Sequence, residues 1–141
     1  MSHRLDNMIW NAITTGNKDI ATVEGDVGFY RHDIAPFAGF KELKKENLDK
    51  LHITLPPGRK VALHYTDSLP LDTDKWTSLQ QMDVTQMVYE WPVFSFTTEA
   101  SKLIVPLSDE HIPAMLELTA LTKPGPFLER TIEFGNYFGI F

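Results

Sequence analysis

The segment from residue 103 to residue 141 limits the possible folds more than any other part of the sequence. Residues 103–107 are mostly apolar and typical of a short strand, and Ser-Asp-Glu at 108–110 can cap a helix and place acids in its first turn. Apolar residues at helical spacing then predict a largely buried helix over 112–121. The helix must end at Lys123–Phe127 (KPGPF), because proline cannot continue it. A strand followed by a packed helix predicts a domain that contains both.

Shorter elements are expected in the rest of the chain. Helical spacing predicts helices over 5–13, 41–50 and 128–134. The glycines within 23–31 suggest a small hairpin or an extended stretch broken by a turn, and alternating or β-branched residues predict strands at 61–65, 84–91 and from Tyr137 onward. Residues 95–102 resemble a connector and mark the one plausible boundary. The predicted fold class is α+β, with a mixed sheet and short helices.

Composition and charge exclude several classes of protein. The chain has 141 residues, 43% apolar and 23% charged, which suits a globular domain with a core. Its net charge of -6 opposes binding to nucleic-acid phosphates, so no nucleic-acid partner is expected. No run approaches the roughly 18 apolar residues of a membrane span, and the N-terminus lacks the apolar region of a signal peptide. We therefore expect a cytoplasmic protein without a membrane partner.

The usual motifs of enzyme chemistry are missing from the sequence. There is no cysteine, which excludes disulfides, thiolate metal sites and a cysteine nucleophile. No two of the five histidines have the spacing of a zinc helix, and no serine-hydrolase elbow or nucleotide-phosphate loop occurs. No catalytic residue and no metal ligand can be assigned from these patterns.

Several motifs together resemble one family. The order IVPLS, DEHIPAMLELTALT, KPGPF and RTIEFGNYFGI at 104–140 is similar to the opening of the catalytic domain in a bacterial branch of the GNAT N-acetyltransferases. The same branch is resembled upstream by WNAITTG, APF, LPPG and QMV, at 10–16, 35–37, 55–58 and 86–88. The resemblance extends over nearly the whole chain.

This resemblance implies a partial GNAT-like fold in two parts. Residues 1–95 would form an N-terminal partial GNAT-like lobe, and residues 96–141 would supply the first strand, the helices and the start of the second strand of the catalytic domain. The implied reaction is acetyl transfer from acetyl-CoA, as cosubstrate, to an amine of a small-molecule or peptide acceptor.

One family motif does not occur in the sequence. An Arg/Gln-x-x-Gly-x-Gly/Ala loop, whose backbone N–H groups would hold the coenzyme pyrophosphate, is absent from the 141 residues. We therefore expect no cofactor-binding residues here, no tight binding of acetyl-CoA and no activity of this chain alone. The alternative is a noncatalytic module, derived from the GNAT fold, that binds a small ligand or serves in assembly.

The resemblance also points to a substrate-binding loop. In GNAT domains the loop after the first helix borders the acceptor side of the cleft, which here corresponds to Lys123, Pro124, Gly125, Pro126 and Phe127, together with Arg130. Arg130 could bind a carboxylate or phosphate through two hydrogen bonds. Each residue also has a structural interpretation, because KPGPF can simply end a helix, Phe127 can fill the core, and Arg130 can pair with Glu129 or Glu133.

The end of the sequence predicts an assembly. A final strand over Tyr137–Phe141 without a hairpin partner would expose backbone donors and acceptors together with apolar side chains. Pairing with the first-lobe sheet or with a second copy of the chain would cover it, so a homodimer through this strand is one expected outcome.

Overall fold

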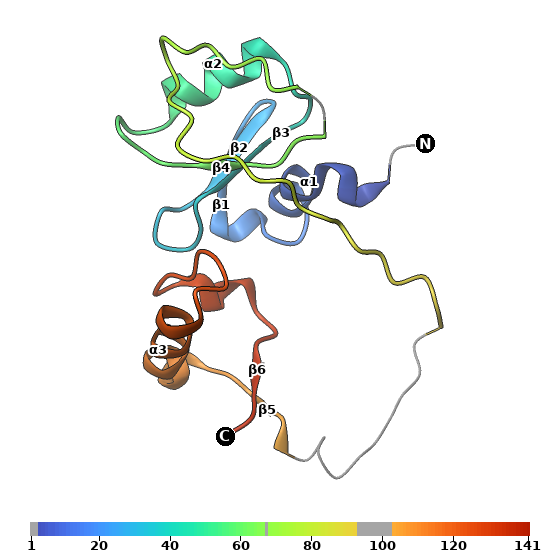
Figure 1. Ribbon diagram of the computed structural model, residues 1–141, viewed down its shortest axis with the longest axis vertical. Helices are drawn as coiled ribbons and strands as arrows, with labels where there is room; N and C mark the ends of the chain where they lie inside the picture. The colour runs from blue at the N-terminus through green and yellow to red at the C-terminus, as the bar shows by residue number, and fades with distance from the viewer. Residues whose placement is uncertain (1–2, 67, 93–102) are drawn as a thin grey trace.

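The computed structural model describes residues 3–66, 68–92 and 103–141 (Figure 1). A four-stranded sheet organises the N-terminal part and a two-stranded sheet the C-terminal part. The N-terminal elements, where η is a 3-10 helix, are η1 (Arg4–Asn7), α1 (Met8–Thr14), η2 (Lys18–Ile20), β1 (Ala21–Glu24), β2 (Val27–Tyr30), β3 (Phe37–Phe40), α2 (Lys45–Thr54) and β4 (Ala62–Leu63). The C-terminal elements are β5 (Val105–Pro106), η4 (Asp109–His111), α3 (Ile112–Thr122), η5 (Thr131–Phe134) and β6 (Phe138–Gly139).

The larger sheet is mixed, as predicted. Its strand order is β1-β2-β3-β4; β2 is antiparallel to both β1 and β3, and β4 is parallel to β3. The predicted hairpin is confirmed: β1 and β2 are joined by Gly25 and Asp26, and Gly25 has a φ of +62°, which favours glycine. The predicted strand at 61–65 is present as the shorter β4.

Two glycines allow α1 to lie close to the sheet. Gly28 of β2 and Gly39 of β3 are paired across the sheet. A Cβ on Gly28 would lie 2.5 Å from the Cδ1 of Ile13, and a Cβ on Gly39 would lie 2.8 Å from the backbone nitrogen of Trp10. The Ala-Pro-Phe-Ala-Gly-Phe sequence around Gly39 did not suggest a strand, because proline and glycine usually interrupt strands. The close packing of α1 explains the glycine.

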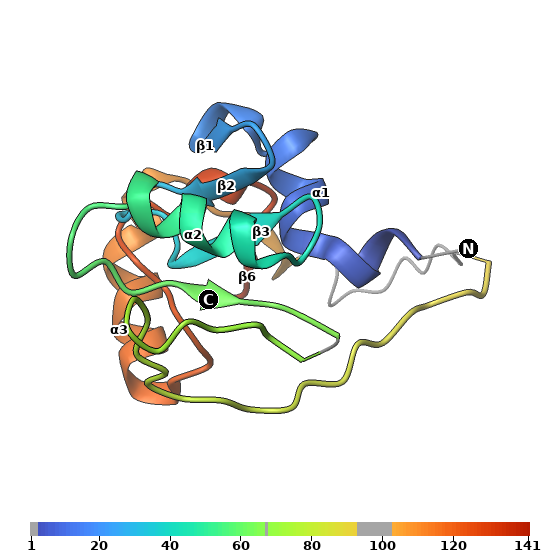
Figure 2. The same ribbon diagram turned by 90° about the horizontal axis from the view of Figure 1, so that it is seen from above.

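Helices lie on both faces of this sheet: α2 covers the face seen in Figure 2, and α1 lies on the opposite face (Figure 1). The α2 face forms one core cluster, whose buried members are Val27, Ala38, Phe40, Leu48, Leu51 and Leu55. The α1 face forms a second cluster with buried Ile13, Tyr30, Ile34 and Ala35, against which Phe134 of the C-terminal part also packs. The fold is therefore a sheet between two helix layers, and the C-terminal part contacts one of these layers.

Hydrogen bonds join the two parts where the β2–β3 connection meets η5. The hydroxyl of Thr131 donates to the backbone carbonyl of Ile34 at 2.6 Å and accepts from the backbone N–H of Leu128 at 2.7 Å. Nearby, the rings of Tyr30 and Phe134 meet edge to face, with centroids 4.9 Å apart. Thr131 is 5% exposed, so these hydrogen bonds are shielded from water.

Two sequence predictions were wrong. The helix over 112–121 forms as α3 but is not largely buried, since Leu118 and Leu121 are 60% and 81% exposed and Met115 is its buried residue. Residues 84–91 are extended and exposed but form no strand, because no neighbouring strand pairs with them among the described residues. The predicted connector and domain boundary at residues 95–96 lie outside the described residues.

The final strand has a partner that the sequence did not suggest. β6 pairs antiparallel with β5 of the same chain, so that Phe138 lies opposite Pro106, rather than joining the N-terminal sheet. The side chains of Phe138, Ile140 and Phe141 stay exposed. Pairing with β5 thus satisfies part of the backbone while leaving an apolar surface at the end of the chain.

Candidate functional site

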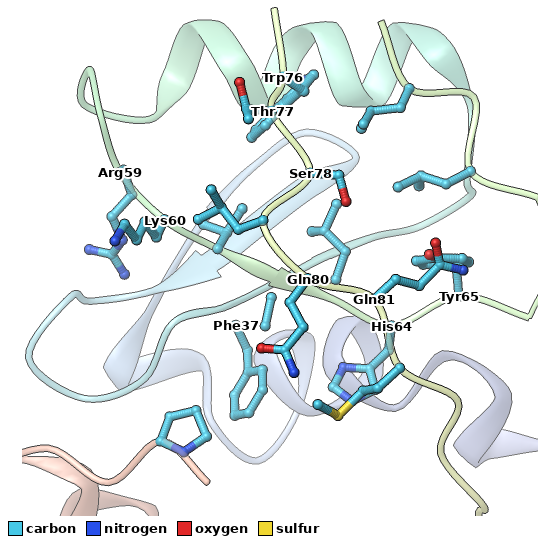
Figure 3. A pocket seen from close by; sticks show the side chains of 18 of the residues that line it. Phe37, Arg59, Lys60, His64, Tyr65, Trp76, Thr77, Ser78, Gln80 and Gln81 are labelled. Carbon is cyan, nitrogen blue, oxygen red and sulfur yellow. The ribbon is translucent and has the colours of Figure 1, made fainter. Parts of the chain in front are cut away.

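A wide, open cleft lies beside β4, the edge strand of the larger sheet, with a volume of about 1690 Å³ (Figure 3). One wall comprises β4 and its flanking residues 59–66, with the C-terminal end of α2. The opposite wall is the extended segment 75–86, and Gly125 and Pro126 of the C-terminal part border the cleft. Binding sites are commonly concave and mostly apolar with a few polar groups, which describes this cleft.

Aromatic rings form much of its lining. The ring of Phe37, on β3, lies 5.6 Å from the imidazole of His64, and the indole of Trp76 meets the imidazole of His52 edge to face at 5.6 Å. The Nε1 atom of Trp76 is buried and has no hydrogen-bond partner among the described residues. A buried donor without a partner is unfavourable, and this atom is closed off from the cleft itself.

Two cationic side chains, Arg59 and Lys60, lie at one end of the cleft (Figure 3). The Nη2 of Arg59 donates to the backbone carbonyls of Tyr30 and Ala35 at 3.2 and 3.3 Å, which holds the guanidinium in place. Desolvation lowers the pKa of Arg59 and the charge of Asp33 raises it, but an arginine stays protonated in proteins. Lys60 is exposed and makes no ion pair within the described parts of the chain.

His64 lies toward the other end of the cleft, near Tyr65 (Figure 3). Partial burial lowers the pKa of His64 below its usual value of 6.5. Its imidazole is therefore neutral at pH 7 and can accept a proton or a hydrogen bond through one ring nitrogen.

The structure brings part of the predicted substrate-binding loop to this cleft. Gly125 and Pro126 border it, whereas Lys123 and Pro124 are exposed at the end of α3. Lys123 adopts a left-handed conformation (φ 49°, ψ 52°), and its N–H donates to the carbonyl of Thr119, so it ends the helix. Phe127 is half-buried, and its ring packs edge to face on Tyr137 with centroids 5.9 Å apart.

Arg130 takes part in a group of ion pairs between the two parts of the chain. Its guanidinium contacts the carboxylates of Asp33, at 3.3 Å, and Glu133. Arg31 contacts the same two carboxylates, Asp33 at 3.4 Å and Glu133 at 3.2 Å. Arg130 does not line the cleft, and this geometry fits the structural interpretation of its role, in which it pairs with Glu133.

Sequence reasoning did not identify Arg59, Lys60, His64 or Trp76 as members of one site. The usable signal was the pair of basic residues between the Pro56–Gly58 turn and the strand at 61–65, since a turn followed by an edge strand can direct neighbouring side chains to a shared surface. Trp76 could not be placed from sequence, because it reaches the site by packing on the α2 core cluster.

Comparisons with known proteins identify the fold. One solved structure, a protein described as a GNAT-family acetyltransferase from Novosphingobium aromaticivorans DSM 12444, matches 99% of this chain with a TM-score of 0.67 and 19% sequence identity. The chain spans 59% of that protein's length. No family model and no curated protein matches the sequence. The predicted fold class, α+β with a mixed sheet and a GNAT-like arrangement, is confirmed.

Acetyl-CoA would need a site for its pyrophosphate, such as a glycine-rich turn at the N-terminus of a helix. Helices α1, α2 and α3 are preceded by Asn7, Lys44 and His111, and none of them begins at a glycine-rich turn that could hold a pyrophosphate. These three helix N-termini therefore offer no glycine-rich pyrophosphate site. Within residues 3–66, 68–92 and 103–141, no helix is long and apolar enough to cross a membrane, and no three His, Asp or Glu side chains are grouped as around a metal ion.

Proposed function

We propose that this chain is the acceptor-side part of a GNAT-type N-acetyltransferase. The observation that carries the proposal is the likeness of 99% of the chain to a GNAT-family fold, with the cleft beside β4 as a place for the acceptor. In the reaction, the amine nitrogen attacks the thioester carbonyl carbon of acetyl-CoA, the C–S bond breaks, the coenzyme leaves as thiolate, and the amine loses a proton. The described residues contribute acceptor binding and no coenzyme contact.

The experiment starts from the gene. The DNA that follows the Phe141 codon is sequenced, and the longest reading frame through it is expressed and assayed for release of the coenzyme thiol with a panel of primary amines. We expect an Arg/Gln-x-x-Gly-x-Gly/Ala segment in the continuation and amine-dependent thiol release. A stop codon after Phe141, or a complete product without acetyl transfer to any amine, would refute the proposal.

A titration of the isolated chain tests the coenzyme prediction. Because the residues present do not fit a pyrophosphate, calorimetry with acetyl-CoA should show no binding heat even at millimolar coenzyme. Micromolar binding would mean that a cradle forms elsewhere, for example between two copies of the chain, and would contradict our assignment of this chain to the acceptor side alone.

The second candidate is a noncatalytic binding or assembly module. It is favoured by the same cleft, since an apolar cavity with a cationic end can bind a ligand without any reaction. A true stop codon after Phe141 combined with ligand binding in the cleft would support this candidate over the enzyme. For either candidate, we propose a cytoplasmic location, which cell fractionation tests.

We further propose that the isolated chain forms a homodimer through Tyr137–Phe141. Phe138, Ile140 and Phe141 are 61%, 63% and 78% exposed, and a second copy would remove these apolar side chains from water. Light scattering at micromolar concentration should give twice the monomer mass, and truncation after Gly135 should reduce it to one. A monomeric full-length chain would refute this assembly.

A further inference from the structure

We propose that the cleft beside β4 binds an elongated apolar molecule that carries one carboxylate, with the carboxylate at Arg59 and Lys60. That this ligand also carries an amine, away from the carboxylate, and is the acetyl acceptor rests on the proposed function, whereas the binding of the carboxylate does not. Three observations support the class of ligand: the charge at one end, the lining of the remainder, and the cavity's size.

The Arg59–Lys60 end of the cleft is positively charged, although the protein as a whole is negatively charged. The chain has a net charge of -6, yet these two adjacent cations line the same end of one cavity. Lys75 also lines the cleft, but its ammonium is already paired with Asp49 at 2.7 Å. Lys60 has no such partner in the described chain, so an anion at this end would gain a charge-assisted hydrogen bond.

Acidic lining residues are placed on other segments. Asp6 belongs to η1 and accepts a hydrogen bond from the backbone N–H of His3, and Asp83 belongs to the extended segment. Neither lies in the stretch 59–66 that carries the two cations. The cationic end therefore favours an anion over an amine, because like charges repel in a partly desolvated site.

The remainder of the lining selects an apolar body. The cleft is also lined by Phe37, Leu63 and Trp76, which are half-buried. Leu63 and Trp76 pack on the α2 core cluster, and Phe37 packs on the α1 core cluster. The cavity volume of about 1690 Å³ exceeds the roughly 300–1,000 Å³ common for small-molecule sites, so the cleft has room for an elongated ligand.

Calorimetry and NMR with octanoate, octylamine, 1-octanol and acetate test this assignment. Octanoate should bind about tenfold or more tightly than octylamine and 1-octanol, because only the carboxylate matches the cationic end, and should exceed acetate because only octanoate fills the apolar part. Octanoate should also shift the indole N–H signal of Trp76, identified with Trp76→Phe. Equal binding of octylamine, equal binding of acetate, or no binding of octanoate would overturn the assignment.

The variant that locates the carboxylate is Lys60→Glu, because Arg59 also holds two backbone carbonyls and its replacement could disturb the fold. We expect about a tenfold or greater loss of octanoate affinity with an unchanged urea midpoint. The control is Lys18→Glu, which makes the same change of charge at a residue outside the cleft and should leave the affinity within about twofold. Equal affinities of the two variants would refute the role of Lys60. These results need no acetyl-CoA, so they stand apart from the proposed acetyl transfer.

Discussion

Replacement of Thr131 by valine should weaken the contact between the two parts of the chain. Valine has nearly the shape of threonine but no hydroxyl, so Thr131→Val removes the hydrogen bond to the carbonyl of Ile34 and the one from the N–H of Leu128. Ile34 is fully buried, and a buried carbonyl without a partner costs about 1–3 kcal/mol. The partly buried N–H of Leu128 adds about 0.5–1.5 kcal/mol. We expect a loss of about 2–4 kcal/mol in the free energy of unfolding.

Urea denaturation followed by far-UV circular dichroism measures this loss. With an m-value of about 2 kcal/mol/M, the midpoint of Thr131→Val should lie about 1–2 M below that of the unchanged chain. The matched control is Thr131→Ser, which keeps the hydroxyl and loses one methyl group, and should cost about 1 kcal/mol. Equal midpoints for the valine and serine variants would show that the hydroxyl does not join the two parts of the chain.

Three further predictions concern stability. Gly39→Ala should lower the free energy of unfolding by about 1–3 kcal/mol, because the new Cβ would lie 2.8 Å from the backbone of α1. The control is Gly16→Ala, which should be nearly neutral because no atom lies within 4 Å of its Cβ. Equal urea midpoints for the two variants would contradict the close packing of α1. Partial desolvation raises the pKa of Asp33, but its backbone hydrogen bond and the two neighbouring arginines outweigh this and lower the pKa below its usual value. The stability that this carboxylate contributes is therefore complete above about pH 4 and is lost as the pH falls through the lower folded-state pKa. Asp33→Asn removes this contribution, so the urea midpoint of the variant should fall less between neutral pH and pH 3 than that of the unchanged chain. The same pH profile for both proteins would refute this role of Asp33. Lys123→Gly should raise the free energy of unfolding by about 1 kcal/mol, since glycine adopts φ 49° without strain, while Lys123→Ala should give no gain; thermal melts of both variants decide the point.

Local signals explain which elements could be predicted. The hairpin of β1 and β2 follows from a glycine-containing turn between strand-forming residues, and α3 follows from an acidic first turn and the KPGPF stop. The resemblance to GNAT acetyltransferases also led to the right fold class. For the hairpin and for α3, the residues that decide the structure lie within a few positions of one another, so the pattern is visible in the sequence.

Tertiary contacts decided the elements that the sequence did not predict correctly. β3 forms because Gly39 lets the backbone of α1 approach the sheet, a contact between segments distant in sequence. Residues 84–91 have strand-forming side chains but no neighbouring strand among the described residues, and propensity alone does not form a ladder of hydrogen bonds.

In the candidate site, too, some features could be predicted from the sequence and others depend on tertiary contacts. The family resemblance pointed to a loop of which Gly125 and Pro126 border the cleft, and the sequence left two roles open for Arg130. Folding placed Arg130 among ion pairs with Asp33 and Glu133, and it brought Trp76 to the cleft that Arg59 and Lys60 line beside β4. Spacing along the chain can reveal which residues share one helix or strand. Which segments meet across a cleft depends on how the sheet packs between its helices, and that is settled only when the core clusters form.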